Sequence, residues 1–385
     1  MCGTRLRRPV YASPAPVSVT SLGQVLPGRT EVYFCKACGH LVTPPLPDLA
    51  SYYEEDYRIL VESEEEDQLY ELSPTGERTY RADHQLRRLL EKVPVGPGAR
   101  LVDWGCAKAA TFRRLAMLRP DLDLFLFDVS KQYLPFWDRF VDPSHRATHV
   151  PPAEWEGTFD LVTSFFSLEH VAEPRDTMAA MATVLAPCGR LYFMVPDTRR
   201  NAGDFVVADH VNHFTPPSLQ RIVADAGLRL IELDDRAHEG AFVVIAEKPA
   251  VGTGASTEDA NTASPPLAEL EPTVRELATY WQSFGDRVRA HEAGPAAGAR
   301  TAIYGSGFYG TFIATCLRDL DRVAVFVDQN PYRQKQTLLG KAVVAPEALP
   351  RDISHVYIGL NPRRARDEVA KVEAWRDRAL TLFLP

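Results

Sequence analysis

The turn after the first apolar strand of the middle region carries residue types that can bind a nucleoside. The segment LVDWGCAKAATF, residues 101–112, ends its strand at Asp103 and continues into Gly105. A second strand ends at Asp128, where a carboxylate can accept hydrogen bonds from both hydroxyls of a ribose. The pattern therefore predicts a nucleoside site, and it fits NAD and S-adenosylmethionine equally well.

A histidine-rich segment further along the chain could supply acid–base chemistry. Asp209, His210 and His213 lie within five positions of each other in ADHVNHF. A histidine with a pKa near neutrality can take a proton from a hydroxyl or an α-carbon. Asp209 can hold the histidine tautomer or bind a hydroxyl of the acceptor. The alternative is that His210 and His213 cap a helix and pack against the sheet.

Apolar strands alternate with amphipathic helices between residues 99 and 248. Such alternation predicts an α/β fold with helices on both faces of a doubly wound sheet. The segment ERTYRADHQLRRLLEKV has leucines at helical spacing and predicts a helix that leads into this region. The acidic stretch Ser51–Asp67 predicts a solvated helix or loop.

Residues 249–273 are rich in Gly, Ser, Thr and Pro, and they predict a flexible linker. A helix at 274–291 and a second strand–helix series follow it. We therefore expect an N-terminal module at 1–62, a doubly wound domain at 78–248 and a C-terminal Rossmann-like domain at 274–385.

Residues 159–197, FDLVTSFFSLEHVAEPRDTMAAMATVLAPCGRLYFMVPD, resemble the corresponding part of class I methyltransferases. With LVDWG and FDVS before it in order, the resemblance covers residues 80–248. It implies that the cofactor is S-adenosylmethionine and that the protein is a methyltransferase.

The resemblance also implies which residues hold the cofactor. Asp103 and Gly105 are expected near its methionine end, and Asp128 is expected on its ribose. Phe127 or Val129 is expected beside the adenine.

The glycine-rich loop of that family is altered in this chain. Family members usually have Gly-Cys-Gly-x-Gly where this chain has alanine at 107 and 109. Alanine in a left-handed conformation costs about 1 kcal/mol, whereas at ordinary dihedrals it adds only one methyl group of crowding. Lys108, between the two alanines, is expected to bind the methionine carboxylate. Glu169 and His170, in SLEHV, are candidates for the cofactor side, for packing or for catalysis.

The histidine-rich segment is similar to the Glu-His-x-x-x-Phe-Ser segment of three-domain sugar C-methyltransferases. Asp209 takes the place of the glutamate, His210 matches the histidine and Phe214 matches the phenylalanine. The resemblance implies a sugar acceptor, free or nucleotide-linked, that is methylated on carbon or oxygen with His210 as the base. The first alternative is a methyltransferase that acts on another small molecule.

The same family carries an N-terminal zinc module with two cysteine pairs. Cys35 and Cys38, in CKACGH, have the C-x-x-C spacing of two thiolates on one tetrahedral ion. Cys2 resembles the second half of the other pair. The fourth ligand lies before Met1, or His40 supplies it, or the module has lost its metal. The tyrosines of SYYEEDYR are similar to a segment that reaches the substrate in that family, or they pack on the surface.

The C-terminal region contains a possible second nucleotide site. Gly305, Gly307 and Gly310 have G-x-G-x-x-G spacing between a strand and a helix, and Asp328 ends the next strand. This fingerprint supports an NAD-linked or non-catalytic protein as the competing hypothesis. The loop also resembles the C-terminal domain of the sugar C-methyltransferases, which implies a scaffold that needs no NAD.

Charge and composition limit which other classes of protein the chain can belong to. With 385 residues and a net charge of −8, the chain has no electrostatic footprint for nucleic acid. We find neither a bilayer-spanning apolar run nor a secretion signal. Six scattered cysteines fit a reducing cytoplasm. We expect a cytoplasmic enzyme with a small-molecule partner and no membrane partner.

Overall fold

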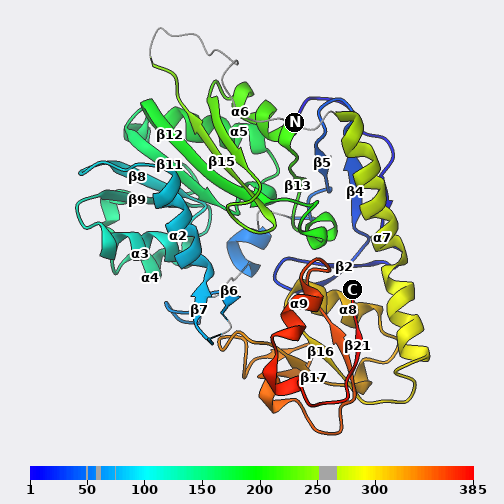
Figure 1. Cartoon of the computed structure of the whole chain (residues 1–385). Coiled ribbons are helices and arrows are strands. Elements are labelled where there is room, and N and C mark those ends of the chain that lie inside the picture. The colour runs from blue at the N-terminus through cyan, green and yellow to red at the C-terminus, as the bar shows by residue number, and fades with distance from the viewer. Residues whose placement is uncertain (49–50, 58–61, 74, 251–266) are drawn as a thin grey trace.

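The computed structural model describes residues 1–48, 51–57, 62–73, 75–250 and 267–385. Three sheets, of seven, six and four strands, organise this part of the chain (Figure 1). No helix among the described residues has the length and apolar character needed to cross a bilayer.

The seven-stranded sheet forms the middle of the molecule. In spatial order its strands are β10 (Arg146–Thr148), β9 (Asp123–Asp128), β8 (Arg100–Trp104), β11 (Phe159–Phe165), β12 (Leu185–Pro196), β15 (Ala241–Glu247) and β14 (Arg229–Asp234). All pairings are parallel except those of β15, which is antiparallel to both neighbours. The predicted α/β fold is thus confirmed, with a mixed sheet. The chain order reverses between β8 and β11, so a ligand crevice is expected at their carboxyl ends.

Helices cover both faces of this sheet because its strands are apolar on both sides. One face carries α2 (Arg81–Lys92) and α3 (Ala110–Leu118), and the other carries α5 (Pro174–Val184) and α6 (Pro216–Asp225). In β8, Leu101 packs into the core under α2 and α3, whereas the next residue, Val102, packs into the core under α5 and α6. This alternation is the two-residue period of a strand buried on both faces. The predicted helix in ERTYRADHQLRRLLEKV is α2, preceded by a hairpin of β6 (Leu69–Leu72) and β7 (Arg78–Tyr80).

The six-stranded sheet organises the C-terminal part of the chain. Its strands, in spatial order, are β18 (Thr337–Leu338), β19 (Lys341–Val344), β17 (Val323–Val327), β16 (Thr301–Tyr304), β20 (His355–Ile358) and β21 (Thr381–Phe383). The sheet is parallel apart from β18. It is flanked by α8 (Phe308–Cys316) and α9 (Ala365–Ala370).

A long helix, α7 (Leu267–Ala293), lies beside both the N-terminal strands and the C-terminal sheet (Figure 1). Its buried apolar residues belong to one cluster that also contains Val32 of the N-terminal module and Phe326 of the C-terminal sheet. The helix was predicted to start at 274, after a linker at 249–273. The structure has helix from Leu267, because Leu270 is buried at its start. The rest of the predicted linker, 251–266, lies outside the described residues.

The N-terminal module shares its sheet with the middle of the chain. Its strands β1 (Tyr11–Ala12), β4 (Glu31–Phe34) and β5 (Leu41–Val42) continue onto β13 (Asn212–His213). A hairpin of β2 (Val17–Val19) and β3 (Val25–Pro27) adds a bridge from Val19 to Val207. The module therefore packs directly on the histidine-rich segment.

Candidate active site

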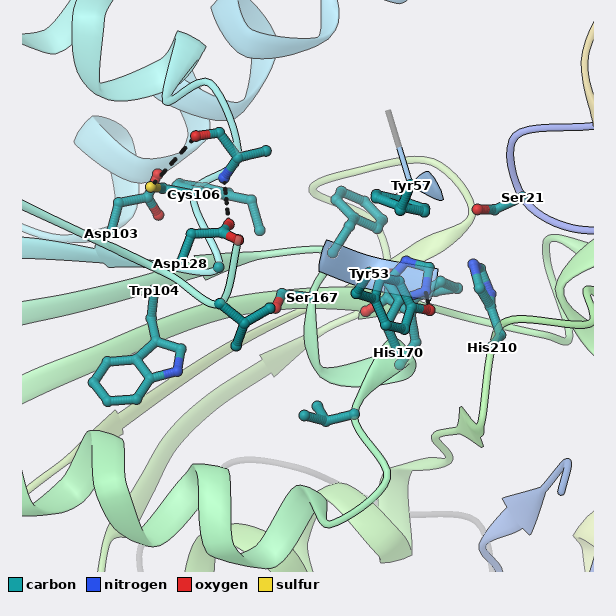
Figure 2. A pocket seen from close by; sticks show the side chains of 18 of the residues that line it. Ser21, Tyr53, Tyr57, Asp103, Trp104, Cys106, Asp128, Ser167, His170 and His210 are labelled. Carbon is teal, nitrogen blue, oxygen red and sulfur yellow. Dashed lines mark hydrogen bonds between the residues drawn. The ribbon is translucent and has the colours of Figure 1, made fainter. Parts of the chain in front are cut away.

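A cavity of about 640 Å³ lies over the carboxyl ends of β8, β9, β11 and β12. Two groups of side chains face each other across it, as Figure 2 shows. Asp103, Trp104 and Asp128 lie at one end, and His170 and His210 lie at the other with tyrosines from the N-terminal part. The volume is in the range of small-molecule sites.

The altered loop after β8 keeps the backbone shape that glycines usually provide. Gly105, Ala107 and Ala109 have φ of +72°, +46° and +56°. The Gly105 nitrogen donates to the Phe127 carbonyl at 2.8 Å. A Cβ at Gly105 would lie 2.1 Å from Ser167 Oγ, so only glycine fits there. Both alanines are thus left-handed and strained, and the alternative of ordinary dihedrals is excluded.

The two alanine methyl groups have different surroundings. Ala107 lines the cavity, whereas Ala109 is buried in the core beneath α3. The methyl group of Ala109 therefore takes no space from the cavity. Of the two alanines, only Ala107 lines it.

Replacing Ala107 by glycine is expected to stabilise the fold by about 1 kcal/mol, because glycine adopts φ of +46° without strain. Thermal unfolding followed by circular dichroism should show a Tm about 2–4 °C higher. The matched control, Ala116→Gly inside α3, should lower the Tm, since glycine weakens a helix interior. A lower Tm for Ala107→Gly would show that residue 107 is not left-handed in solution.

Two buried carboxyl groups end the strands at this side of the cavity. Asp128 accepts hydrogen bonds from the nitrogens of Ala107 (2.8 Å) and Ser130 (3.0 Å), one on each oxygen. Each oxygen keeps a further lone pair for a ligand hydroxyl. Burial raises the pKa of Asp128, and it raises the pKa of Asp103 to about 7 although Thr163 donates to that carboxyl group. Val129, 48% exposed, lines the cavity next to Asp128.

Lys108 has a different position from the one predicted. Its Nζ donates to the main-chain carbonyls of Ser63 (3.0 Å) and Glu66. Burial lowers its pKa to about 8. Two of the three N–H donors of this ammonium group therefore anchor the acidic segment, although Lys108 also lines the cavity.

The acidic segment is also less solvated than predicted. Among its described residues, Glu66 and Asp67 are buried, and Asp67 pairs with Arg114 at 2.9 Å. Glu64 pairs with Arg113 at 3.4 Å. The segment folds onto α3 because basic residues of that helix neutralise it, and this arrangement was not visible from composition.

The other end of the cavity is built around a buried His–Asp pair. His210 Nδ1 lies 2.5 Å from Asp204 Oδ1, and since an ionised carboxylate only accepts, Nδ1 carries the proton. Burial alone would lower the pKa of His210, but the hydrogen bond and charge of Asp204 raise it to about 9. Burial alone would raise the pKa of Asp204, but His213 and His210 hold it well below its usual range.

Asp204 was missed by sequence reasoning. It lies in a 3₁₀ turn, Ala202–Val206, six positions before His210. An acid followed by a histidine at that distance is not a motif, and only folding brings the two side chains together.

The two other residues predicted for catalysis, Asp209 and His213, do not line the cavity. Asp209 is fully buried and accepts from the Ser21 nitrogen (2.6 Å) and the Ser21 hydroxyl (2.7 Å). Its carboxylate therefore secures the 20–23 loop, and Asp204 orients the histidine in its place. His213 is fully buried between Asp204 and Thr43 and does not line the cavity.

Glu169 was predicted on the cofactor side, and the structure brings it to the histidines. Glu169, His170 and His210 each offer one nitrogen or oxygen atom, and these atoms lie within 4.8 Å of one another. Burial raises the pKa of Glu169 to about 7. Among the described residues, its Oε2 has no hydrogen-bond partner. His170 is held by the Tyr53 hydroxyl at 2.7 Å from its Nδ1, and burial lowers its pKa to about 4.

The three cysteines predicted as metal ligands do come together. Cys2, Cys35 and Cys38 lie with their sulfur atoms within 4.8 Å of one another, and the Cys2 and Cys35 sulfurs are 3.4 Å apart. His40 is not in this cluster, because its Nε2 lies 3.1 Å from Asn212 Oδ1. Its Nδ1 has no hydrogen-bond partner among the described residues, so a fourth ligand from His40 stays a prediction.

The C-terminal glycine motif lies where the C-terminal region contacts the middle of the chain. The Asp328 carboxylate accepts from the Ser306 nitrogen (2.9 Å) and hydroxyl (2.6 Å), so its own loop occupies one of its oxygens. At the start of α8, the Tyr309 hydroxyl accepts from the Gly203 nitrogen at 2.6 Å. Phe308 and Tyr309 line the main cavity. The start of α8, directly after this motif, thus forms part of the wall of the cavity described above.

Comparison with known proteins points to the same part of the chain. Residues 75–233 match a family model described as a methyltransferase domain. A ubiquinone biosynthesis O-methyltransferase of Burkholderia pseudomallei is 27% identical over 165 residues, which are 37% of this chain and 69% of that protein. Its counterpart in Thiobacillus denitrificans is 25% identical over 207 residues, 48% of this chain and 84% of that one.

A solved S-adenosylmethionine-dependent methyltransferase of Mesorhizobium loti covers 46% of this chain and all of its own, at 17% identity and a TM-score of 0.35. The match to the family model includes β8, β9, β11 and the loop after β8, which form the end of the cavity with Asp103 and Asp128. Residues 75–233 thus form a class I methyltransferase domain, and the protein is an S-adenosylmethionine-dependent methyltransferase.

Proposed function

We propose that the protein methylates an oxygen or a carbon of a sugar, free or nucleotide-linked, with His210 as the general base. The observation that supports this proposal is that one cavity joins the cofactor end, with Asp103 and Asp128, to the buried pair of His210 and Asp204. A methyl acceptor lying between the two ends would contact both.

The cofactor end fits S-adenosylmethionine. Asp128 would hold the ribose hydroxyls, the loop from Gly105 to Ala107 would lie along the methionine part, and Val129 would flank the adenine. The bound cofactor supplies an electrophilic methyl group. Apart from that group, the protein has to position the acceptor, exclude water and remove one proton.

His210 is placed to remove that proton. Its Nδ1 is held by Asp204, so the Nε2 atom is the one left for the acceptor. When His210 takes a proton, the Asp204 carboxylate stabilises the imidazolium that forms, as in other His–Asp pairs. The base acts in its neutral form, so activity should rise with pH up to the raised pKa of His210, about 9.

The walls of the cavity suit a polyhydroxylated acceptor. Tyr53, Tyr57 and Glu169 offer hydrogen-bonding groups next to His210, and Asn201 and Tyr309 extend the polar wall toward the C-terminal domain. We infer that residues 274–385 act as a scaffold that completes this wall, and that they carry no redox chemistry.

The relatives favour a second candidate, the hydroxyl of an aromatic ring, because they are named for ubiquinone biosynthesis. Both candidates are tested by incubating the full chain with methyl-¹³C-labelled S-adenosylmethionine and separate acceptors. Nucleotide-linked sugars, nucleotide-linked keto sugars, free sugars and catechols form the panel. Label on a sugar, located on carbon or oxygen by NMR, supports the proposal. Label on catechols alone supports the second candidate, and no label on any acceptor while S-adenosylhomocysteine binds refutes both.

We also propose that Cys2, Cys35 and Cys38 bind one structural zinc ion. Tetrahedral zinc with Zn–S bonds of about 2.3 Å places its sulfurs about 3.8 Å apart, which matches the cluster. Cys35 and Cys38 are buried on a tight turn in which the Gly39 nitrogen donates to the Cys35 carbonyl at 2.8 Å. The chain supplies three thiolates, and the fourth position belongs to another group.

Purified protein is accordingly expected to contain about one zinc per chain by plasma mass spectrometry. Cys38→Ser should lose most of it and lower the Tm, because metal binding contributes to folding. Cys188→Ser, at an exposed cysteine outside the cluster, should keep the metal. Equal zinc in both variants, or none in the wild type, would refute the site.

A further inference from the structure

His213 is a buried histidine that the mechanism above does not use. It is fully buried, and its Nδ1 lies 3.1 Å from Asp204 Oδ2. Its Nε2 lies 2.9 Å from Thr43 Oγ1. The other oxygen of Asp204 binds His210 at 2.5 Å. A chain of hydrogen bonds therefore runs from Thr43 in the N-terminal module through His213 and Asp204 to His210 at the cavity.

The backbone of the N-terminal module keeps Thr43 and His213 of this hydrogen-bond network next to each other. Strand β13 pairs antiparallel with β5, so His213 lies opposite Leu41. The Thr43 nitrogen donates to the Val211 carbonyl at 2.9 Å. Two main-chain contacts thus fix the segment on either side of Asn212, and Thr43 has little freedom to leave His213.

Both oxygens of Asp204 accept hydrogen bonds in this network. One oxygen accepts from His210, and the other accepts from His213 and, at 2.5 Å, from the Thr198 hydroxyl. Because the carboxylate is an acceptor only, His213 must carry its proton on Nδ1. A neutral His213 then accepts the Thr43 hydroxyl proton at Nε2. Asp204 therefore sets the tautomer of His213, and Thr43 of the N-terminal module holds the other ring nitrogen.

We propose that Thr43 and His213 are positioning residues through which the N-terminal module holds Asp204, and so fixes the orientation of His210 at the acceptor. The proposal rests on the role of His210 proposed above. Buried hydrogen-bond networks act as units, so the loss of an outer member loosens the inner ones. The N-terminal module would then be part of the catalytic apparatus without touching the substrate.

The groups that face His210 determine whether its pKa rises or falls when the network is disturbed. Burial lowers the pKa of His210, whereas Asp204, Asp209 and Glu169 raise it, and the ring of His170 lies with its centroid 4.6 Å away. Asp204 contributes most of the increase, through its hydrogen bond and its charge. When Asp204 is less well held, the pKa of His210 should therefore fall toward its ordinary value.

The test uses the full chain with its metal and four variants. Thr43→Val removes the hydroxyl at nearly constant shape, and Thr43→Ser retains it. His213→Asn keeps a donor near the Nδ1 position and loses the Thr43 bond, whereas His213→Gln keeps a polar atom near the Nε2 position and loses the Asp204 bond. Side-chain ¹⁵N NMR of histidine-labelled protein gives the pKa of His210 directly. The pH profile of kcat, measured with the acceptor that the labelling experiment identifies, gives the pKa of His210 in the complex.

Thr43→Val and both His213 variants should lower the pKa of His210 by about one unit, and the plateau kcat should fall about tenfold. Thr43→Ser should restore wild-type values, and the Kd of S-adenosylhomocysteine should be unchanged throughout. If folded Thr43→Val has the wild-type His210 titration and plateau kcat, the proposal is wrong. Thr43→Val decides this alone if the His213 variants do not fold. The NMR titration needs no turnover, so it separates failure of this proposal from failure of the proposed function.

Discussion

Changing His210 to alanine should reduce kcat by about 10²–10⁴-fold and leave the affinity for S-adenosylhomocysteine unchanged. The side chain lies at the end of the cavity opposite Asp128, so its loss removes the proton acceptor without touching the cofactor end (Figure 2). In the wild type, kcat should rise with pH with a slope near one and level off near pH 9, because only the neutral imidazole accepts a proton. The rise should be absent in the variant.

This expectation is checked with initial rates between pH 6 and 10 and with calorimetric titration of S-adenosylhomocysteine. His355→Gln, in the C-terminal sheet and outside the cavity, is the matched control and should keep both values. Turnover of His210→Ala within a factor of about three of the wild type would mean that the base is elsewhere. Loss of cofactor binding would mean that His210 is structural.

Changing Asp128 to asparagine should weaken S-adenosylhomocysteine binding about 100-fold, which corresponds to about 3 kcal/mol. A charged acceptor forms stronger hydrogen bonds with ribose hydroxyls than an amide does. The amide would also place its NH₂ group against one of two main-chain donors, Ala107 and Ser130, which now bind the two oxygens of Asp128.

Calorimetry at fixed pH measures this effect, and thermal unfolding shows whether the variant is folded. Asp142→Asn is the control, since that carboxylate caps an exposed turn at Ser144 and does not line the cavity. NAD and NADP are titrated beside S-adenosylhomocysteine. Unchanged binding in Asp128→Asn would place the ribose elsewhere, and binding of NAD that depends on Asp328 would revive the competing hypothesis.

The sequence by itself determined the sheet and the cofactor end of the site. Apolar strands were predicted between residues 99 and 248 because a strand buried on both faces must be apolar throughout, as in β15, Ala241–Glu247. Strand β10 was missed because RAT, at the edge of the sheet, has no apolar run. The structure brings Asp103, Gly105 and Asp128 to one cavity, because they lie at or just after the ends of strands whose carboxyl ends must meet. The conformation of the turn was left open between left-handed and ordinary dihedrals, and the structure shows that both alanines are left-handed.

Only the tertiary structure decided the partners of the polar side chains. His210 was singled out from its neighbours in sequence. Its partner Asp204 belongs to a separate turn, and it is Asp204, not Asp209, that holds the tautomer of His210. Lys108 was assigned to the cofactor, but it anchors the acidic segment, and His213 is linked to Thr43, 170 positions away. The physical reason is that apolar periodicity records burial along one element, whereas a hydrogen bond depends on angles and distances between elements that packing alone sets.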